Sequence, residues 1–593
     1  METILGIDLG TTNSAVSMIR DGKAVVLEED GQKILPSVVG LDGSGKLLVG
    51  FPASNQWTLA PDRTIRSVKR KMGSGETVRL GDQTYTPQEI SAIILRTLKE
   101  RAERLLGQEA RKAVITVPAF FNEQQREATR EAGELAGLEV VRIINEPTAA
   151  SLTYNPNPEQ LQRLLIYDLG GGTFDVSIVQ TEQGVVEVLS SHGDTQLGGD
   201  DFDHLLMDFV CDKFREEHKL DLRAALTSRS RVLKAVEQAK CRLSFDAFTT
   251  LQEEFIAEQG GVPLHLNMEL SRMDYEPLIE PLLNKTLVRV DEALSDAKLT
   301  AKQIDRVILV GGASRTPMVH RLLQEQLGQP IHSEVDPDLC VSMGAAIQGG
   351  LIAGVDLGPV LVDITPHTLG IQCLSERHGF PSHYHFAPII ERNTALPASR
   401  SEVFGTCFDD QEKVLINVFQ GEHSDVRQNE AVGGIELEGL ANAKRGHEIL
   451  VRFDLDLDGI LTVTATEKMT GLEKKLTIDN VMSRFRSEDR EQAKQRLEAV
   501  FSGSDAAAAA ERQPPTPEPD EDLSPEIKGP IDKARELLAQ AERLLDDANQ
   551  QDAEEMQELI DQLREAVNAR AVDDIQDVSA KLDDLVFYLQ DAL

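Results

Sequence analysis

The sequence predicts a multidomain protein in which an α/β region is followed by an all-β region and a small helical bundle. Three observations carry this prediction. At 593 residues the chain is too long for a single hydrophobic core. Its apolar residues first form continuous runs separated by amphipathic stretches, and then alternate with a period of two. Near the C-terminus they recur at helical spacing, so each pattern marks one region.

Residues 1–358 form the predicted α/β region. The apolar runs at 114–118 and 163–170 are typical of strands that are buried on both faces of a sheet. Long amphipathic stretches lie between such runs, and residues 87–106 give the clearest example of an expected helix. A Gly-Pro pair followed by a short apolar run then predicts an interdomain linker at 359–363.

The remaining sequence changes first to strands and then to helices. Period-two alternation with turns predicts an all-β domain over residues 364–480. One amphipathic helix is expected within 481–501, and the acidic, Pro-rich stretch at 502–529 is expected to be a linker. Residues 530–593 are expected to form a bundle of three short helices. Its apolar positions are Ile531, Ala534, Leu537, Leu538, Ala541, Leu544, Leu545, Met556, Leu559, Ile560, Leu563, Val567, Ile575, Val578, Leu582, Leu585 and Leu589.

Composition argues against several classes of partner. A formal net charge of −38 disfavours nucleic acids and anionic membranes, because binding to phosphate groups needs fields of Lys and Arg. We expect neither a signal peptide nor a membrane span, since no stretch approaches ~20 apolar residues. The cysteines are scattered and odd in number, which predicts reduced thiols and a cytoplasmic location. They are Cys211, Cys241, Cys340, Cys373 and Cys407.

Two similar phrases give the strongest functional signal. They are IDLGTTNSAVS at 7–17 and YDLGGGTFDVS at 167–177. In each, a strand ends in Asp and is followed by a turn of small residues and a second strand. Because glycines let backbone N–H groups approach an anion, we interpret both phrases as phosphate-binding hairpins. Asp8 and Asp168 would hold a hydrated Mg²⁺ beside the phosphates, and the two hairpins imply two similar subdomains that face one nucleotide.

A third strand, VILVGGASRTP at 307–317, also ends in a glycine turn. Gly312 would lie against the sugar of the nucleotide, and Arg315 would stack on its base. Each turn alone is compatible with a plain turn that binds nothing. Three such turns, two of them with Asp at the strand end, favour a nucleotide site.

Two other Gly-containing stretches resemble ligand loops but lack an essential residue. Residues 40–47 have the glycine and lysine spacing of a P-loop, but Leu47 stands where a Ser or Thr is needed. Residues 454–465 have Asp spacing typical of a calcium loop, but Ala465 stands where a bidentate Glu is needed. We expect β-hairpins or turns at both places.

Together the motifs resemble those of the seventy-kilodalton heat-shock protein family, the DnaK-type chaperones. The resemblance covers residues 3–480. It implies an actin-like α/β ATPase domain, an apolar linker, an all-β sandwich domain that binds peptides, and a helical lid. It also implies an ATP-dependent chaperone, active in protein folding and stress response, that binds short extended apolar segments of unfolded proteins and cycles its affinity by ATP hydrolysis. The motifs are GIDLGTTNSAV, VPAFFN, RIINEPTAASL, YDLGGGTFDVS, LGGDDFD, ILVGGASRTP, MGAAIQGG and VLVDITPHTLGI.

The resemblance assigns three sets of residues around the nucleotide. The matches to catalytic positions are Asp8, Lys69, Glu146, Asp168, Thr173 and Asp175, and Asp8 and Asp168 also match positions that hold Mg²⁺ through water. The matches to phosphate-binding positions are Gly10, Thr11, Thr12, Asn13, Gly170, Gly171, Gly172, Gly198 and Gly199. The matches to adenosine-binding positions are Glu237, Lys240, Ser244, Gly312, Arg315 and Asp338. Positioning and electrostatic stabilisation are what phosphoryl transfer needs, and this set is sufficient for slow hydrolysis.

The resemblance also assigns coupling and peptide-binding residues. Pro118, Arg126, Arg142 and Asp363 match residues that couple the domains, and the linker is expected to dock on the ATPase domain as an added strand in the ATP state. In the β-domain, the apolar peptide pocket is matched by Ile371, Phe404, Val414 and Ile416, and the arch over the peptide by Leu374 and Cys407. From the residues alone, the alternation there predicts sandwich core.

The implied cofactors are ATP and Mg²⁺, with K⁺ as a further candidate. The implied partners are unfolded or extended polypeptides, a J-domain co-chaperone and a nucleotide-exchange factor. We expect a chain that is mainly monomeric, with no nucleic-acid or membrane partner.

Three features depart from the family pattern. In the adenosine pocket, Cys241, Ala313 and Asp336 replace more usual residues. The segment 374–393 is longer than usual and contains His378, His383 and His385; without Cys or acidic partners at matching spacing, we expect a flexible, client-touching loop and no metal site. The Pro-rich stretch interrupts the lid helix, so the lid is expected to be tethered and not hinged.

Two alternative functions remain at this point. Sugar kinases and filament-forming ATPases share the actin-like fold, but neither needs the β-domain or an apolar linker. A nucleotide-gated scaffold dedicated to one partner or assembly would keep both domains. The breadth of unfolded clients that bind would separate such a scaffold from a general chaperone.

Overall fold

The structure is a computed structural model, and it divides by packing into two units, Met1–Ser504 and Asp505–Leu593, each of which is described by itself. In the first unit it describes residues 3–154, 160–328, 331, 336–355, 357, 360–377, 380–440, 444–477, 492–498, 500 and 501. In the second it describes selected residues from Lys533 to Val586.

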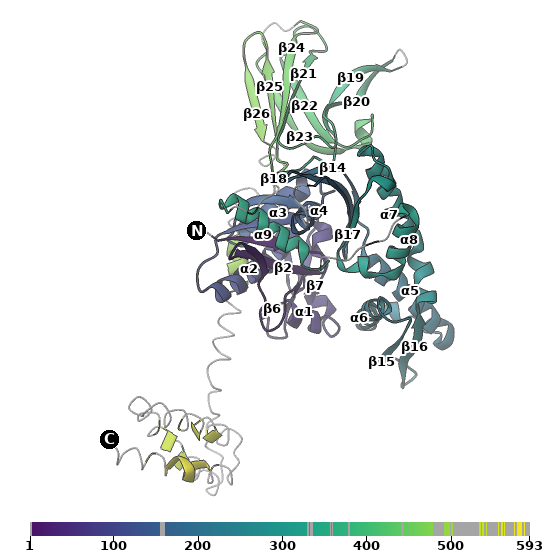
Figure 1. The fold of residues 1–593 in the computed structure, drawn as a ribbon, viewed down its shortest axis with the longest axis vertical. Helices are drawn as coiled ribbons and strands as arrows, with labels where there is room; N and C mark the ends of the chain where they lie inside the picture. Colours follow the sequence, from purple (N-terminus) through teal and green to yellow (C-terminus); the bar gives the residue numbers. More distant parts are fainter. Residues whose placement is uncertain are drawn as a thin grey trace. The chain divides into compact units, whose positions relative to one another are not determined.

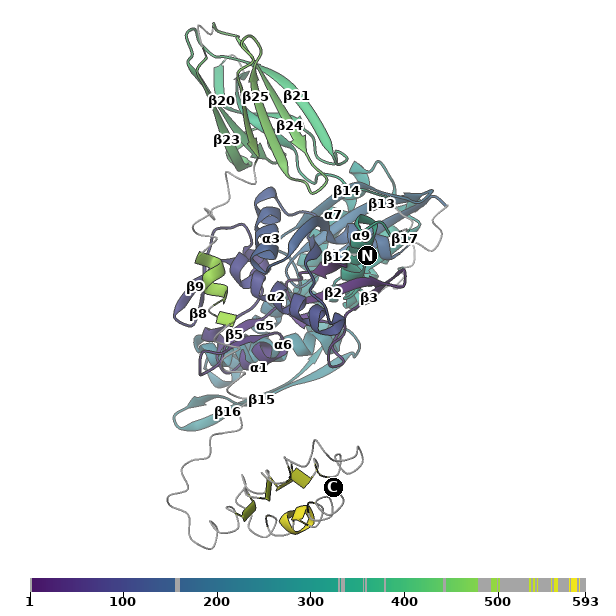
Figure 2. The ribbon, with the colours of Figure 1, turned by 90° about the vertical axis from the view of Figure 1, so that its left-hand side faces the viewer.

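Two sheets with related topology form the centre of the α/β region (Figures 1 and 2). In each, three consecutive antiparallel strands are joined by strands parallel to the first. The first sheet has the order β11-β10-β1-β2-β3, from β1 (Ile4–Asp8), β2 (Asn13–Arg20), β3 (Lys23–Val26), β10 (Lys112–Val117) and β11 (Glu139–Asn145). The second has the order β17-β12-β13-β14-β18, from β12 (Gln162–Leu169), β13 (Phe174–Glu182), β14 (Val185–Asp194), β17 (Arg306–Val310) and β18 (Val360–Val362). The two similar phrases of the sequence therefore occupy equivalent places, at β1–β2 and at β12–β13.

Helices pack around these sheets. They are α1 (Phe51–Gln56), α2 (Pro87–Leu106), α3 (Glu123–Leu135), α4 (Glu146–Thr153), α5 (Gly199–His218), α6 (Leu226–Leu243), α7 (Arg272–Asp296), α8 (Pro317–Leu327) and α9 (Cys340–Ile352). The short 3-10 helices are η1 (Pro61–Arg63), η2 (Val68–Lys71), η3 (Leu222–Ala224), η4 (Ala301–Gln303), η5 (Gly312–Arg315) and η6 (Val426–Gln428). The helix expected at 87–106 is confirmed, and it begins with a capping box in which Thr86 accepts from the N–H of Glu89.

Short strands complete the α/β region. They are β4 (Leu35–Pro36), β5 (Val39–Leu41), β6 (Leu47–Val49), β7 (Thr64–Ile65), β8 (Val78–Leu80), β9 (Gln83–Tyr85), β15 (Phe248–Gln259) and β16 (Val262–Ser271). Residues 40–47 connect the antiparallel pair β5 and β6, so the hairpin or turn expected there is confirmed.

Small residues let α4 and α9 cross between the two sheets at backbone distance. A Cβ atom on Gly344 of α9 would lie 1.8 Å from the carbonyl oxygen of Ala149 on α4. A Cβ atom on Gly6 of β1 would lie 2.0 Å from the backbone nitrogen of Ala346. The motifs NEPTAASL and MGAAIQGG therefore have a packing reason, because only small residues let these backbones approach so closely.

The linker is a strand of the second sheet. Val360, Leu361 and Val362 pair in parallel with Val185, Val186 and Glu187 of β14 (Figure 1). The linker is therefore paired as an added strand of the α/β region, and its docking in the ATP state stays a prediction. This pairing satisfies the backbone of the apolar run, and the side chains of Leu361 and Val362 are half-buried.

The β region, residues 364–477, consists of two four-stranded sheets that share one apolar core. One sheet has the order β20-β19-β22-β23 and the other the order β21-β24-β25-β26. The strands are β19 (Leu369–Arg377), β20 (Phe380–Ile390), β21 (Ala398–Gly405), β22 (Lys413–Gln420), β23 (Glu430–Glu438), β24 (Glu448–Leu455), β25 (Leu461–Glu467) and β26 (Glu473–Thr477). The hairpin expected at 454–465 is the turn between β24 and β25.

The expectation of a flexible loop at 374–393 is wrong. Most of this segment belongs to β19 and β20, which pair in antiparallel fashion from Leu369–Ile390 to Arg377–Phe380. His383 and His385 lie on β20, whereas His378 lies outside the described residues. The physical reason is alternation, since Phe386 and Ile390 face the interior while the side chain of His383 is exposed.

Residues 492–498 and 500–501 are helical and pack against the α/β region, near α2 (Figure 2). Ala493, Leu497 and Phe501 are buried in the same apolar cluster as the core of α2. Arg496 forms an ion pair with Glu89, whose side chain is fully buried, at 2.7 Å. The helix expected within 481–501 is therefore present over its described part, and it is held by both apolar and ionic contacts.

The second unit has a separate apolar core. Its described core residues are Ala534, Leu537, Leu538, Ala541, Met556, Leu559, Ile560, Leu563, Ile575, Val578, Leu582 and Val586. Val586 was not among the expected positions; the other eleven were. The Pro-rich stretch at 502–529 lies outside the described residues, as do Ile531, Leu544, Leu545, Val567, Leu585 and Leu589.

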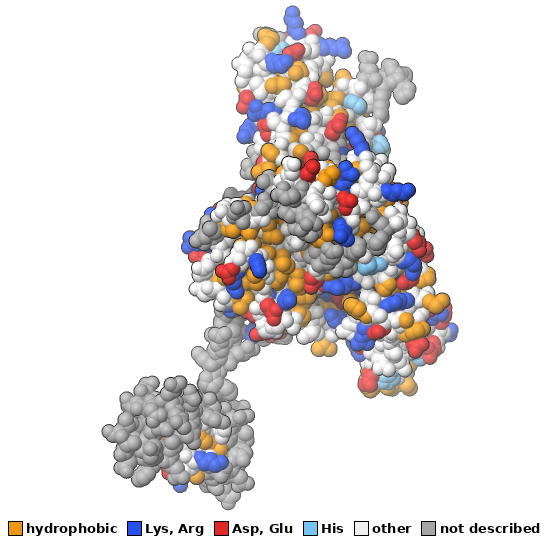
Figure 3. Space-filling view, viewed as in Figure 1, with side chains coloured by type: hydrophobic (Ala, Val, Ile, Leu, Met, Phe, Trp, Pro, Cys, Tyr) orange, Lys and Arg blue, Asp and Glu red, His pale blue; other side chains and the backbone are white. Residues whose placement is uncertain are grey.

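No helix in the described ranges is both long enough and apolar enough to cross a membrane. On the face shown in Figure 3, Lys and Arg side chains are interspersed with Asp and Glu side chains. All five cysteines are unpaired thiols.

We predict that Gly344→Ala destabilises the α/β region by about 2–3 kcal/mol, because its methyl group would collide with the backbone of Ala149. Thermal unfolding followed by calorimetry measures this effect as a lower midpoint. Gly43→Ala is the matched control, since the nearest atom to its Cβ is 3.9 Å away. Equal midpoints for the two variants would contradict the packing argument.

Candidate functional site

A cavity of about 380 Å³ opens where the strands of the two central sheets end. It is lined by the turn after β1, the turn after β12, the turn after β17, and the ends of α5 and α6. Eighteen of the expected site residues line it: Asp8, Gly10, Thr11, Thr12, Asn13, Lys69, Glu146, Asp168, Gly170, Gly171, Thr173, Gly199, Glu237, Lys240, Ser244, Gly312, Arg315 and Asp338.

The glycine turns interlock with one another. A Cβ atom on Gly171 would lie 1.9 Å from Oγ1 of Thr12, and one on Gly198 would lie 2.5 Å from the carbonyl oxygen of Gly171. The N–H groups of Gly170 and Gly199 donate to the carbonyls of Thr173 and Gly170, at 3.1 and 2.9 Å. Gly171 and Gly198 are therefore needed for the close packing of the turns against one another, whether or not a ligand is bound. Gly172, Gly198 and Asp175 lie in these elements but are not among the residues that line the cavity.

Four carboxylates gather at the inner end of the cavity around one lysine. Lys69 of η2 forms an ion pair with Glu146, at the first position of α4, and both side chains are buried. Burial, and then the charge of Glu146, raise the pKa of Asp8 to about 7. Burial and the charge of Glu146 also raise the pKa of Asp175 to about 7 and that of Asp168 well above its usual range. The site has an excess of negative charge that a bound cation would neutralise.

Each aspartate is positioned by the main chain or a neighbouring strand. Asp168 and Asp175 face each other in the β12–β13 register. The N–H of Phe120 donates to Oδ1 of Asp175 at 3.0 Å, and the hydroxyl of Thr116 donates to Oδ1 of Asp8 at 3.2 Å. The carboxylates are thus oriented before any ligand is present.

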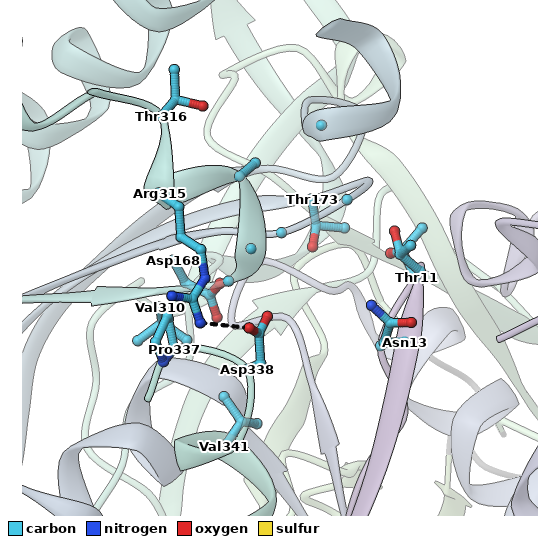
Figure 4. Close-up of a pocket in the computed structure, with 18 of the residues that line it drawn as sticks. Thr11, Asn13, Asp168, Thr173, Val310, Arg315, Thr316, Pro337, Asp338 and Val341 are labelled. Carbon is cyan, nitrogen blue, oxygen red and sulfur yellow. Dashed lines mark hydrogen bonds and ion pairs between the residues drawn. The ribbon is translucent and has the colours of Figure 1, made fainter. Parts of the chain in front are cut away.

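The opposite end of the cavity carries Arg315 (Figure 4). Arg315 donates to Asp338 at 2.7 Å and to Asp336 at 3.2 Å, so two carboxylates fix its guanidinium. Thr11, Asn13 and Thr173 lie across the cavity from it. Lys240 is held by Asp203, at 2.8 Å, and by the carbonyl of Gly199, at 3.0 Å.

Apolar residues at the Arg315 end were missed by the sequence analysis. Phe245, Pro337 and Val341 line the cavity there together with Cys241 and Ala313. Phe245 could have been found from the sequence, because it directly follows Ser244, just after the end of α6. Its side chain is 75% exposed and is not part of the core. Apolar surface beside a planar cation suits a flat heteroaromatic ring.

Three polar contacts join the two halves of the α/β region across the cavity. Arg66 pairs with Glu237 at 2.9 Å, Ser67 donates to Asp200 at 2.5 Å, and Arg70 pairs with Asp201 at 3.2 Å. The guanidinium of Arg66 also lies 4.3 Å from the ring centre of Trp57, the single tryptophan of the chain. Burial alone would raise the pKa of Glu237, but Arg66, Lys234 and Lys240 bring it below its usual value.

The expected coupling residues lie at the boundary between the α/β region and the β region. Asp363 is buried and accepts two hydrogen bonds from the amide of Asn145, at 3.0 and 3.1 Å. Arg126 donates to the other side of the same Asn145 at 2.7 Å. Asn145 thus joins Arg126 to the end of the linker. Pro118 is buried at the end of β10, and its carbonyl accepts from the N–H of Phe121 at 3.2 Å.

Further ion pairs hold the β region at this boundary. Asp458, in the β24–β25 turn, pairs with Arg130 at 2.8 Å and with Arg142 at 3.7 Å. Arg392 pairs with Asp296 of α7 at 3.1 Å. The carboxylate of Glu430 accepts two hydrogen bonds from the amide of Asn122, at 2.7 and 2.8 Å. Asn145, Asp296 and Asp458 were not expected from the sequence, because only their partners in space identify them.

The expected peptide-binding residues fall into two groups. Ile371 and Ile416 are buried in the core of the β region, and Phe404 and Val414 pack at its margin. Leu374 and Cys407 are exposed. Ile371 and Ile416 thus belong to the sandwich core, as the alternation indicated. Of these four apolar residues, only the partly buried Phe404 and Val414 are accessible to a ligand.

Among the described residues, no three His, Cys, Asp or Glu side chains converge to hold a metal ion directly. A cation bound by Asp8 and Asp168 would therefore keep water molecules in its coordination shell, which is usual for Mg²⁺.

A family model and individual relatives identify the same protein family. Residues 4–592 match the family model described as "Hsp70 protein". The chain is 46% identical over 486 residues, 80% of its length and 80% of theirs, to proteins named "Chaperone protein DnaK" from Thermotoga neapolitana, Thermotoga petrophila and Thermotoga maritima.

We predict that Arg66→Ala speeds the release of a bound nucleotide about five-fold, because a partly buried ion pair of about 1 kcal/mol across the cavity is lost. Stopped-flow release of a fluorescent ADP derivative measures the rate. Lys234→Ala is the control, since Lys234 lies 3.9 Å from Glu237 on the same helix and, among the described residues, forms no ion pair across the cavity. Equal rates for wild type and Arg66→Ala would show that this pair does not hold the cavity closed.

Proposed function

Since the chain belongs to the Hsp70 family, we propose that ATP binds in the cavity between the two central sheets and that the residues around Lys69 hydrolyse it. The chain is an ATP-dependent molecular chaperone with ATPase activity. One observation carries the assignment of the site: three glycine turns, the carboxylates of Asp8, Glu146 and Asp168, and the buried Lys69 line a single cavity.

The hydrolytic step transfers the γ-phosphoryl group to water, and its products are ADP and phosphate. Asp175, oriented by the N–H of Phe120, accepts a hydrogen bond from the attacking water and directs its lone pair at phosphorus. Lys69 places its ammonium beside the γ-phosphate and stabilises the charge on the transferring oxygens. Glu146, which is paired with Lys69, holds the lysine side chain in place. Thr11, Thr12 and Thr173 supply hydroxyl groups to the phosphates from the two hairpin turns.

The donor set fits a hydrated Mg²⁺. Burial and the charge of Glu146 raise the pKa values of Asp8, Asp168 and Asp175, and a bound cation would favour the ionised forms of these carboxylates. Asp8 and Asp168 would hold the ion through water. When bound, the ion supplies positive charge to the phosphate oxygens. K⁺ is a further candidate for neutralising the same acidic site.

The adenosine end is assigned to Arg315, which two carboxylates hold, and to Glu237, Lys240, Ser244 and Gly312. The planar guanidinium stacks on the base, and apolar residues such as Phe245 cover its edge. This assignment departs from the sequence expectation in one respect. Lys240 is engaged by Asp203, so it orients the turn of Gly199 as well as facing the ligand.

Peptide binding is assigned to the β region, with the ATPase as an actin-like domain and the C-terminal residues as a small bundle. Leu374 and Cys407 would arch over an extended apolar segment whose side chain enters at Phe404 and Val414. The paired linker strand and the Asn145 contacts support coupling between the two sites, which linkage makes reciprocal.

We further propose a cytoplasmic location and partners of three kinds: unfolded polypeptides, a J-domain co-chaperone and a nucleotide-exchange factor. The DnaK relatives support the first of these by their name as chaperones. Nothing in the comparisons favours a scaffold dedicated to one assembly.

Lys69→Ala is expected to lower single-turnover ATP hydrolysis by about a hundred-fold or more, since an electrostatic stabiliser of the transition state is removed. ATP binding, measured by calorimetry, is expected to persist because the glycine turns remain. Lys71→Ala is the matched control, since Lys71 is exposed on the same short helix and pairs only with Glu76 among the described residues. Hydrolysis at the wild-type rate by Lys69→Ala would overturn the assignment.

Val414→Thr is expected to weaken the binding of a short Leu-rich peptide by about five-fold, because a hydroxyl replaces a methyl group that would contact the peptide side chain. Fluorescence anisotropy of a labelled peptide measures the affinity. Leu415→Thr is the control, because Leu415 is 61% exposed on the opposite face of β22. A larger loss in the control than in Val414→Thr would move the peptide site to the other face.

A further inference from the structure

His367 is seated at the boundary between the β region and the α/β region. Its Nε2 lies 3.2 Å from the carbonyl oxygen of Phe120, and its ring meets the ring of Phe120 edge to face with 4.4 Å between centroids. The side chain is only partly exposed. His367 belongs to the β region and Phe120 to the α/β region, so this contact exists only while the two regions are docked.

The backbone of Phe120 connects His367 with Asp175, one of the four carboxylates near Lys69. Its N–H donates to Oδ1 of Asp175 at 3.0 Å, and the N–H of Ala119 also stabilises that carboxylate. The carbonyl that His367 contacts and the N–H that orients Asp175 belong to the same residue. A shift of this backbone segment therefore moves a group that we assign to positioning the attacking water.

The surroundings of His367 favour its neutral form. The pKa of His367 is lowered to about 4, chiefly by burial; the hydrogen bond with the Phe120 carbonyl and the charge of Glu422 oppose this shift, and the charges of Arg126 and His192 add smaller lowering effects. His192 stacks on the other side of Phe120, with 6.3 Å between ring centroids, and is held by Asp296 and Glu292. His423 and Glu430 line a small cavity beside His367 but do not contact its ring through any hydrogen bond among the described residues.

We propose that His367 is a proton-sensitive positioning residue: its neutral imidazole holds the β region on Phe120 and, through that residue, holds Asp175 in place, and protonation of His367 releases both. The inference rests on the proposed function of Asp175. It adds a regulator, the proton, that acts at a distance from the nucleotide.

The direction of the pH effect follows from linkage. The docked state lowers the pKa of His367 from its ordinary 6.5 to about 4, so the docked state binds fewer protons. The docking contribution of His367 is therefore complete above pH 6.5 and is lost as the pH falls towards 4. Between pH 7.5 and pH 5 it shifts the docking equilibrium about thirty-fold towards release.

Other acidic groups at the boundary act in the opposite sense. Burial raises the pKa of Glu123 to about 8, and burial also raises the pKa of Asp456 and Asp363. These groups favour docking at low pH. They are common to wild type and to any His367 variant, so the ratio between the two proteins isolates His367.

The test compares full-length wild type with His367→Gln, whose amide can still donate to the Phe120 carbonyl but does not titrate between pH 5 and 8. Docking is measured with ATP bound, as the hydrogen-exchange protection of residues 360–362, corrected for the intrinsic pH dependence of exchange. Single-turnover hydrolysis is measured on the same samples. His423→Gln is the matched control, and His367→Phe is a second variant that fills the site without a titrating group.

We expect protection of residues 360–362 in wild type to fall about thirty-fold relative to His367→Gln between pH 7.5 and pH 5. We expect the ratio of hydrolysis rates, wild type over variant, to fall over the same range, and His423→Gln to follow wild type. Parallel pH profiles for wild type and both His367 variants would overturn the inference. A change in docking without a change in the hydrolysis ratio would overturn the link to Asp175. The Lys69→Ala experiment tests the proposed function independently, because its outcome does not depend on either result for His367.

Discussion

The contact between α4 and α9 is the constraint on which the rest of the α/β region depends. The two helices cross at backbone distance because Gly344 and Ala149 have no bulk to separate them. This crossing joins the two related sheets and brings the ends of β1 and β12 together. It also fixes Glu146, which begins α4, beside Lys69. A larger residue at the crossing would separate the sheets and, with them, the carboxylates of the cavity.

The close approach of the sheets concentrates negative charge at the inner end of the cavity. Asp8, Asp168, Asp175 and Glu146 are gathered around one ammonium group, and burial makes their mutual repulsion strong. A bound cation would relieve that repulsion, because it would stabilise the ionised carboxylates. The contacts of Arg66, Ser67 and Arg70 join the two halves of the α/β region across this cavity.

The same region of the chain connects the cavity with the β region by two short routes. In one, Asn145 joins Arg126 to Asp363 at the end of the linker. In the other, Phe120 offers its N–H to Asp175 and its carbonyl to His367. In each route one hydrogen bond leaves the α/β region: it joins Asn145 to Asp363 in the first route and Phe120 to His367 in the second. These contacts support the proposed coupling between the cavity and the β region.

By itself, the sequence determined the features that depend on neighbours along the chain. Periodicity identified the α/β and β regions and the helix at 87–106, and the glycine turns with Asp8 and Asp168 located the cavity. Only the tertiary structure decided the features that depend on partners distant in sequence. It paired Arg66 with Glu237 and Asp296 with Arg392, placed Leu497 against α2, and turned residues 374–393 into a hairpin. The reason is physical: local patterns report backbone preference and burial, whereas a partner in space is set by packing that no local pattern contains.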